Sequence, residues 1–222
     1  MSSRDGRRLG IFGGSFNPIH FGHLLLADEI VEILSLDRLV FVPAAEPPHK
    51  LGGDLAPARA RFAMTALAVR EHPRFDVSDV ELRRLGPSYT VDTLAALESQ
   101  GDLHLVIGSE TFLDLLSWRE PEEVARRARL VVVPRAGSEF HPEAPATQKV
   151  LAGLSLPAFA RAVPGEVVSA GRAPLLVPAA SLSISASDLR RRVRQGASLA
   201  YRLPDRVIDY IREHGLYQGS SH

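Results

Sequence analysis

The stretch that decides the fold reads Gly13-Gly14-Ser15-Phe16-Asn17-Pro18-Ile19-His20-Phe21-Gly22-His23. It follows a short apolar run, residues 8–13, which indicates a buried strand. It leads into residues 22–36, where apolar side chains recur with helical spacing. A second apolar run, residues 38–43, comes next. Strand, helix and strand in this order form a βαβ unit, whose crossover connection makes the two strands parallel.

The rest of the chain continues the alternation of strands and helices. Further strands are expected at 75–80, 103–107, 130–133 and 175–177, and further helices at 57–71, 90–99, 111–116, 121–127, 187–194 and 204–213. This order predicts an α/β fold, a doubly wound and mostly parallel sheet with a small C-terminal helical segment. Ligands of such sheets bind at the carboxyl ends of the strands.

Residues 1–222 are expected to form a single domain with a core over 8–217. Residues 136–173 are an extended region rich in Pro, Ala and Gly, with one expected helix at 147–154. No Pro- or Ser-rich linker divides the chain, which is the reason for expecting one domain.

Composition excludes several classes of protein. The 222 residues carry 26 basic and 26 acidic side chains, so the net charge is zero and binding to a nucleic-acid backbone is not expected. Cysteine is absent, which excludes disulfides, zinc–thiolate sites and thiol catalysis. No apolar run reaches the roughly 18 residues that span a bilayer. A cytoplasmic location without membrane contact is therefore expected.

The loop after the first strand has the chemistry of an anion site. Its glycines allow the backbone to turn and approach a ligand. The helix that begins near Gly22 directs N–H groups and a partial positive charge at this loop. His20 and His23 flank the helix start, which predicts phosphate binding.

The segment Ile184-Ser185-Ala186-Ser187-Asp188-Leu189-Arg190 offers a second anion site. Two hydroxyls, a helix N-terminus and a guanidinium converge there. A plain helix cap followed by a solvated arginine face is the alternative interpretation.

Several stretches together resemble one family. GGSFNPIHFGHL, residues 13–24, resembles the first motif of the bacterial nicotinate mononucleotide adenylyltransferases, which are nucleotidyltransferases with an HxGH signature. Residues 47–50 (PPHK), 88–94 (SYTVDTL) and 184–190 are similar to further motifs of that family. Gly108 to Phe112 followed by Trp118 resembles its GxDxF…W stretch. Glu110 stands where the family has Asp, and Ala186 where it has Ser.

The resemblance implies a Rossmann-like nucleotidyltransferase fold and a set of site residues. The catalytic residues would be His20, His23 and Arg190, with no metal ligand in the protein. The ATP-binding residues would be Gly13, Gly14, Ser15, Phe16, Gly22, Gly108, Glu110, Ile184, Ser185 and Ser187. The residues that bind the second substrate would be Asn17, Lys50, Ser88, Tyr89, Thr90 and Trp118.

Two of these expectations have a local physical reason. Ser88 or Thr90 can cap the helix that follows, and the same helix end would hold the carboxylate of nicotinate, since no Lys or Arg lies within residues 88–94. Trp118, the only tryptophan, is interpreted as a platform for the pyridine ring or as a core aromatic.

The function implied by the resemblance is adenylyl transfer from ATP to nicotinate mononucleotide. The products would be nicotinic acid adenine dinucleotide and pyrophosphate, and Mg²⁺ would bind through the ATP phosphates. Two alternatives remain at this stage. One is a related enzyme that acts on nicotinamide mononucleotide or another small molecule, and the other is a nucleotide-binding module without turnover.

Overall fold

A computed structural model of the chain describes residues 6–46, 55–134, 137, 139–163, 171–179 and 182–219. Its strands are β1 (Arg8–Gly14), β2 (Arg38–Pro43), β3 (Phe75–Val77), β4 (Asp102–Gly108), β5 (Ala128–Val133), β6 (Ala160–Arg161) and β7 (Leu175–Leu176). Its α-helices are α1 (Phe21–Ile33), α2 (Ala58–Val69), α3 (Thr90–Leu97), α4 (Ser109–Leu113), α5 (Pro121–Arg127), α6 (Pro145–Gly153), α7 (Ala186–Arg194) and α8 (Asp205–Glu213). Two 3₁₀ turns, η1 (Glu98–Gln100) and η2 (Leu115–Ser117), follow α3 and α4.

All described strands lie in one sheet, in the order β3-β2-β1-β4-β5-β7-β6. Each neighbouring pair is parallel. The chain moves outward from β1 to β3, returns to the centre, and then moves outward through β4 and β5. The order therefore reverses between β1 and β4, which is where doubly wound sheets bind their ligands.

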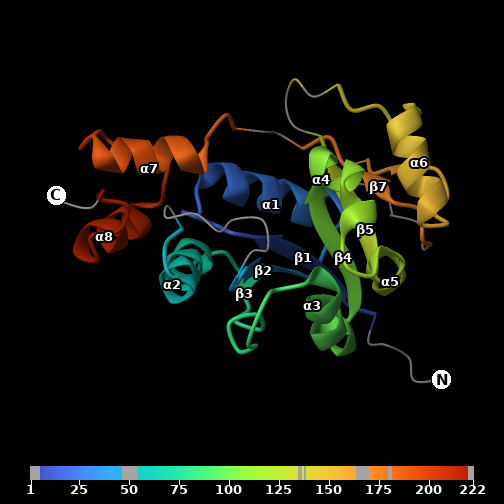
Figure 1. Ribbon diagram of the computed structural model, residues 1–222, viewed down its shortest axis with the longest axis horizontal. Helices are drawn as coiled ribbons and strands as arrows, with labels where there is room; N and C mark the ends of the chain where they lie inside the picture. The colour runs from blue at the N-terminus through green and yellow to red at the C-terminus, as the bar shows by residue number, and fades with distance from the viewer. Residues whose placement is uncertain are drawn as a thin grey trace.

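Helices cover both faces of this sheet, as a doubly wound fold requires. One core holds α1, α2 and α8 against one face, and the other holds α3, α4, α5 and α6 against the opposite face. Successive strand residues point to opposite faces, so Val106 joins the first core while Leu105 and Ile107 join the second. Helices α7 and α8 lie together at one end of the molecule, far from α6 (Figure 1).

The predicted fold class is confirmed, and some boundaries were wrong. The strand expected over 75–80 ends at Val77, because Ser78 begins a turn in which its side chain accepts from the Val80 N–H. The helix expected over 22–36 ends at Ile33, since Ser35 has a φ of 47°, outside helical geometry. The helix expected over 111–116 is instead α4 followed by a 3₁₀ turn. Within the described residues, no helix is both long and apolar enough to cross a bilayer.

Candidate active site

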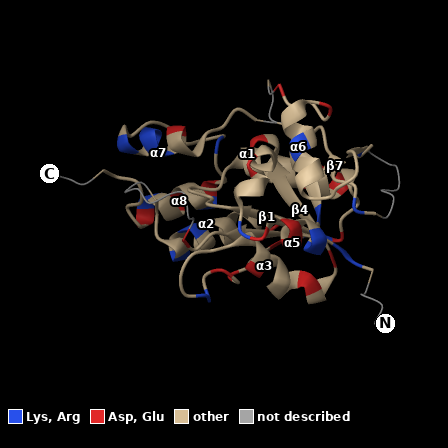
Figure 2. Cartoon of the chain, turned by 45° about the vertical axis from the view of Figure 1, so that its right-hand side comes forward, with Lys and Arg blue, Asp and Glu red and all other residues tan. Residues whose placement is uncertain are grey.

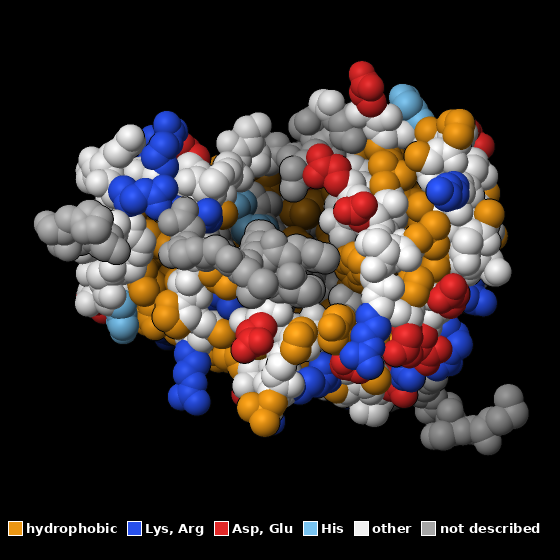
Figure 3. All heavy atoms as spheres, in the orientation of Figure 1, with side chains coloured by type: hydrophobic (Ala, Val, Ile, Leu, Met, Phe, Trp, Pro, Cys, Tyr) orange, Lys and Arg blue, Asp and Glu red, His pale blue; other side chains and the backbone are white. Residues whose placement is uncertain are grey.

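The site lies where β1 and β4 end side by side. These strands pair in parallel through Arg8–Asp102 to Ile11–Leu105, so their last residues, Gly14 and Gly108, reach the same edge of the sheet. Residues 15–20, called here the histidine loop, connect β1 to α1. The molecular surface is hollowed near its middle, and histidine side chains line the wall of the hollow (Figure 3).

His20 and His23 lie at the start of α1, as predicted. His20 is the N-cap residue, and the two imidazole rings stack with centroids 3.7 Å apart and planes at 26°. The His20 N–H donates to Nδ1 of His23 over 3.3 Å, so a neutral His23 carries its proton on Nε2. The structure thus brings two imidazoles together at a helix N-terminus.

His20 is buried, and this sets its charge. Only 6% of the residue is exposed. Burial lowers the pKa of His20 from 6.5 to about 4, because the charged imidazolium loses its hydration. Its Nδ1 has no hydrogen-bond partner among the described residues. His20 is therefore a neutral ring at pH 7.

Gly22 lies close against the His20 ring. A Cβ atom at Gly22 would lie 3.0 Å from Nδ1 and 3.1 Å from Cε1 of His20, and 3.4 Å from the carbonyl oxygen of Leu182. At these distances the His20 ring would have to shift by a few tenths of an ångström. A glycine at this position leaves room for the His20 ring, which stacks on His23.

Arg190 reaches the same loop from the far end of the chain. Its Nη1 donates to the carbonyl oxygen of Asn17 over 2.9 Å, across 173 residues of sequence. The fold thus brings Arg190 to the histidine loop. Basic side chains gather on α7 (Figure 2), and Arg190 is the one of them that makes this contact to the loop.

Ser185 and Ser187, at the start of α7, do not cap this helix with their side chains. Ser185 is the N-cap residue but makes no side-chain bond to the helix. Its Oγ lies 2.6 Å from Oγ of Ser187 instead. Both serines are exposed, while Ile184 is half-buried against the first core.

Arg61 supports the histidine loop from below, and the sequence analysis missed it. It is completely buried on α2 and donates to three carbonyl oxygens: Ser15 at 2.9 Å, Ala56 at 2.9 Å and Ala45 at 3.0 Å. Burial lowers the pKa of Arg61 from its ordinary value. The signal in the sequence was a charged residue on the face of a helix that otherwise packs inward, next to Met64 and Thr65.

Phe16 anchors the loop to the core. It has a φ of 41°, a conformation that a bulky residue rarely adopts, and its ring packs edge-on against Phe12, His23 and Phe41. Gly13 is exposed at the end of β1, and a Cβ atom there would meet nothing within 4 Å. The backbone before the loop is thus open to a ligand.

A second group of predicted residues gathers at the start of α3. Tyr89 is its N-cap residue and makes no side-chain cap bond, so the prediction that Ser88 or Thr90 caps this helix was wrong. Ser88 instead accepts from the Glu46 N–H at 3.4 Å and donates its own N–H to the Glu46 carbonyl at 3.3 Å. This exchange joins the loop before α3 to the loop after β2.

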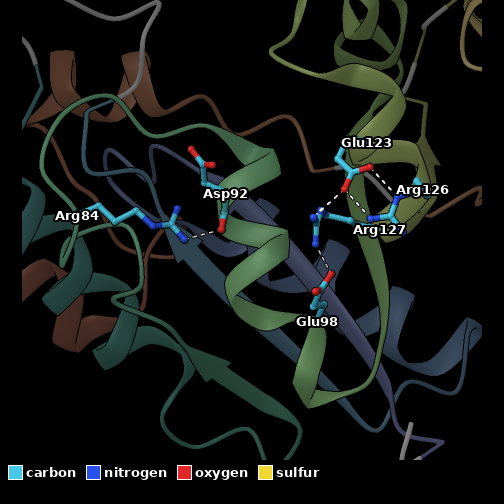
Figure 4. A network of polar contacts seen from close by, with 6 residues as sticks. All are labelled: Arg84, Asp92, Glu98, Glu123, Arg126 and Arg127. Carbon is cyan, nitrogen blue, oxygen red and sulfur yellow. Dashed lines mark hydrogen bonds and ion pairs between the residues drawn. The ribbon is translucent and has the colours of Figure 1, made fainter. Parts of the chain in front are cut away.

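Arg84 and Glu81 hold that loop against α3. Nη2 of Arg84 donates to the main-chain oxygen of Asp92 at 2.5 Å, and Oγ1 of Thr93 donates to the buried Glu81 at 2.7 Å. Figure 4 shows Arg84 reaching Asp92, and, beyond α3, Arg127 lying between Glu98 and Glu123. The contacts of Arg84 and Glu81 hold the first turn of α3, where Thr90 lies.

Trp118 and Arg119 lie beside the start of α3. Trp118 is half-buried and packs against the same core as Tyr89. The Arg119 guanidinium lies over the Tyr89 ring, 4.7 Å from its centroid. Arg119 is thus a cation near Thr90 that the search for basic residues within 88–94 did not find.

Gly108, Glu110 and Lys50 are the remaining predicted residues considered at this site. Gly108 is the N-cap residue of α4, and Glu110 is exposed in the first turn of that helix. Lys50 lies outside the described residues. No group of three or more His, Asp or Glu side chains in the described ranges is arranged to hold a metal ion.

A family pattern described as cytidylyltransferase-like matches residues 11–192, which is most of the chain. The chain belongs to the cytidylyltransferase-like family. The resemblance seen in the sequence motifs is therefore confirmed.

Members of this family from several bacteria are similar over nearly the whole chain. A Thermus thermophilus protein named "probable nicotinate-nucleotide adenylyltransferase" is 45% identical over 214 residues, covering 95% of this chain and 100% of the relative. A Roseiflexus relative of the same name is 42% identical over 212 residues, covering 95% and 98%.

A solved structure supports the fold. It is Plasmodium falciparum nicotinic acid mononucleotide adenylyltransferase complexed with NaAD, which matches with a TM-score of 0.69 and 18% identity and covers 95% of this chain and 97% of its own. The predicted Rossmann-like nucleotidyltransferase fold agrees with this match.

Proposed function

We propose that the protein transfers the adenylyl group of ATP to nicotinate mononucleotide, giving nicotinic acid adenine dinucleotide and pyrophosphate. One observation carries the proposal: two histidines stack at the start of α1, and Arg190 of α7 bonds to the loop before them, at the point where the strand order reverses. This arrangement suits the polyphosphate of a nucleotide. Relatives named for this activity span nearly the whole chain.

The chemistry needs alignment and charge stabilisation. A phosphate oxygen of the mononucleotide attacks the α-phosphorus of ATP, and a new P–O bond forms. The bond from the α-phosphorus to the oxygen that bridges to the β-phosphorus breaks, and pyrophosphate leaves with the electron pair. The attacking oxygen is already anionic, so neither a protein nucleophile nor a strong base is required.

The histidines supply hydrogen-bond donors to the reaction, and other groups of the site supply positive charge. His20 is neutral, since its pKa is about 4, and it acts as a hydrogen-bond donor. His23 donates through Nε2, because its Nδ1 accepts from the His20 N–H. Positive charge comes from Arg190 and from the N-terminus of α1. These groups stabilise the negative charge that develops on the leaving pyrophosphate.

Mg²⁺ fits this proposal as a companion of ATP. The donor set of the described residues offers no protein cage for it, so the phosphate oxygens of ATP would hold the ion. Bound there, Mg²⁺ supplies further charge neutralisation of the polyphosphate.

Recognition of nicotinate is assigned to the start of α3. The first N–H groups of the helix suit a carboxylate, and Arg119 adds a positive charge beside Tyr89. The amide of nicotinamide has one acceptor oxygen, and its NH₂ would face these donors. Replacement of Arg119 by Gln should therefore lower the preference for the acid, measured as the ratio of kcat/KM for the two mononucleotides. Trp118→Ala should weaken both substrates together.

Release of pyrophosphate from ATP tests the function. The enzyme is supplied in turn with nicotinate mononucleotide, nicotinamide mononucleotide and phosphopantetheine. We expect turnover to be fastest with nicotinate mononucleotide. A preference for the amide would refute the acid assignment, and a preference for phosphopantetheine would refute the pyridine nucleotide. The absence of pyrophosphate in all three reactions would leave a nucleotide-binding module.

A further inference from the structure

Asn17 joins three separate parts of the chain to the histidine loop. Its side-chain Oδ1 accepts from the Ala56 N–H at 3.0 Å and from the Tyr217 hydroxyl at 2.8 Å. Its main-chain oxygen accepts from Arg190 at 2.9 Å. Only 6% of Asn17 is exposed; its bond to Ala56 is buried, and those to Tyr217 and Arg190 are partly buried. The segment before α2, helix α7 and the C-terminal segment therefore meet at one residue, three positions before His20.

The conformation and the protonation state of Tyr217 suit the donation of a hydrogen bond to Asn17. It follows α8 with a φ of 65°, a conformation that tyrosine rarely adopts, and its ring packs against the first core. Burial raises the pKa of the Tyr217 hydroxyl above its ordinary value, although Arg190 and Arg61 act in the opposite direction. The hydroxyl thus keeps its proton over the working pH range.

The Tyr217 hydroxyl is not needed for the ring to pack. A phenylalanine ring would pack against the first core in the same place, and a hydroxyl taken out of water is unfavourable unless it is bonded. The bond that satisfies it runs across 200 residues to the loop that carries His20. This combination indicates a role for the hydroxyl at the loop, because packing alone would be served by the ring.

We propose that Tyr217 is a positioning residue for adenylyl transfer: its hydroxyl fixes Asn17, and through Asn17 it fixes both the histidine loop and the guanidinium of Arg190. The proposal rests on the proposed function, because turnover is one of its readouts. Loss of the hydroxyl leaves Oδ1 of Asn17 with the Ala56 N–H, and the loop gains freedom at the residue to which Arg190 binds.

The test compares Tyr217→Phe with Tyr210→Phe. Tyr210 lies on α8, where its ring stacks on His214 at 3.9 Å, and its hydroxyl has no bond among the described residues. Tyr217→Phe should lower kcat for ATP and nicotinate mononucleotide about 10-fold, the effect of one lost hydrogen bond, with a smaller change in KM. Tyr210→Phe should remain within about twofold of the parent on the same scale.

A double-mutant cycle with Asn17→Ala separates positioning from packing. In the Asn17→Ala background, Tyr217→Phe should have no further effect on kcat, because the acceptor of its bond is gone. An equal loss in both backgrounds would show that Tyr217 acts elsewhere and would overturn the proposal. So would unchanged turnover in Tyr217→Phe, or a Tyr217→Phe chain that no longer folds.

Amide hydrogen exchange gives a readout that does not depend on turnover. The amides of residues 15–17, 19 and 20 should exchange faster in Tyr217→Phe, while those of α8 stay as in the parent. Unchanged exchange in the loop would contradict the proposal. If the parent fails to use nicotinate mononucleotide, the proposed function is wrong, and the exchange comparison still decides whether Tyr217 holds the loop.

Discussion

His20 makes the stability of the protein depend on pH in a defined way. The folded protein holds the pKa of His20 at about 4, whereas the unfolded chain has the ordinary value of 6.5. Below pH 6.5 the unfolded chain therefore binds a proton that the folded protein does not. The free energy of unfolding falls as pH drops from about 6.5 to about 4. At 1.36 kcal/mol per pH unit, the loss reaches about 2 kcal/mol at pH 5 and is limited to about 3 kcal/mol.

Urea unfolding of the parent and of His20→Gln, at pH 7 and at pH 5, measures this effect. The difference between the two proteins should change by about 2 kcal/mol in favour of the variant between the two pH values. Other groups that titrate, such as the buried His104, cancel in this difference. The variant His141→Gln removes an exposed histidine and serves as the control. A parent-to-variant difference that is the same at both pH values would refute the assignment of a neutral, desolvated His20.

Three further predictions concern the site. Gly22→Ala should lower kcat by on the order of 10-fold or more with the fold intact, because the new Cβ would lie 3.0 Å from the His20 ring; kcat near the parent value would contradict the need for glycine. Arg190→Lys should lose activity while Arg192→Lys hardly matters, since Arg190 donates to Asn17 in the histidine loop whereas Arg192 donates to Ser198; equal kinetic effects would mean that the arginines of α7 form only a solvated face. Arg61→Met should lower the free energy of unfolding by at least about 3 kcal/mol, because three carbonyl oxygens lose their donor; a loss under about 1 kcal/mol in urea unfolding would argue against this support.

The sequence predicted the fold well where hydrophobic periodicity was strong. The strands at β1, β2, β4 and β5 are apolar runs that the parallel sheet buries on both faces, and the pattern shows this without tertiary information. β6 has two residues and was missed, because so short a strand carries no periodicity. The ends of α1 and β3 were predicted wrongly, because they are set by turns at Ser35 and Ser78 for which the sequence has no recognisable motif.

In the candidate site, too, the sequence predicted the local features and not the long-range contacts. The positions of His20 and His23 at a helix start are local, so a motif next to a predicted strand was sufficient. The bond from Arg190 to Asn17 and that from Tyr217 to Asn17 join residues 173 and 200 positions apart, and only the packed chain brings them together. Arg61 was missed because an arginine within an apolar helix pattern is usually exposed by snorkelling.

The turnover of His20→Ala and His23→Ala tests the central claim most directly. If the two stacked imidazoles stabilise charge on the departing pyrophosphate, each substitution should lower kcat for ATP and nicotinate mononucleotide by about 10²-fold or more, with cooperative unfolding retained. Near-normal turnover in either folded variant would contradict the account.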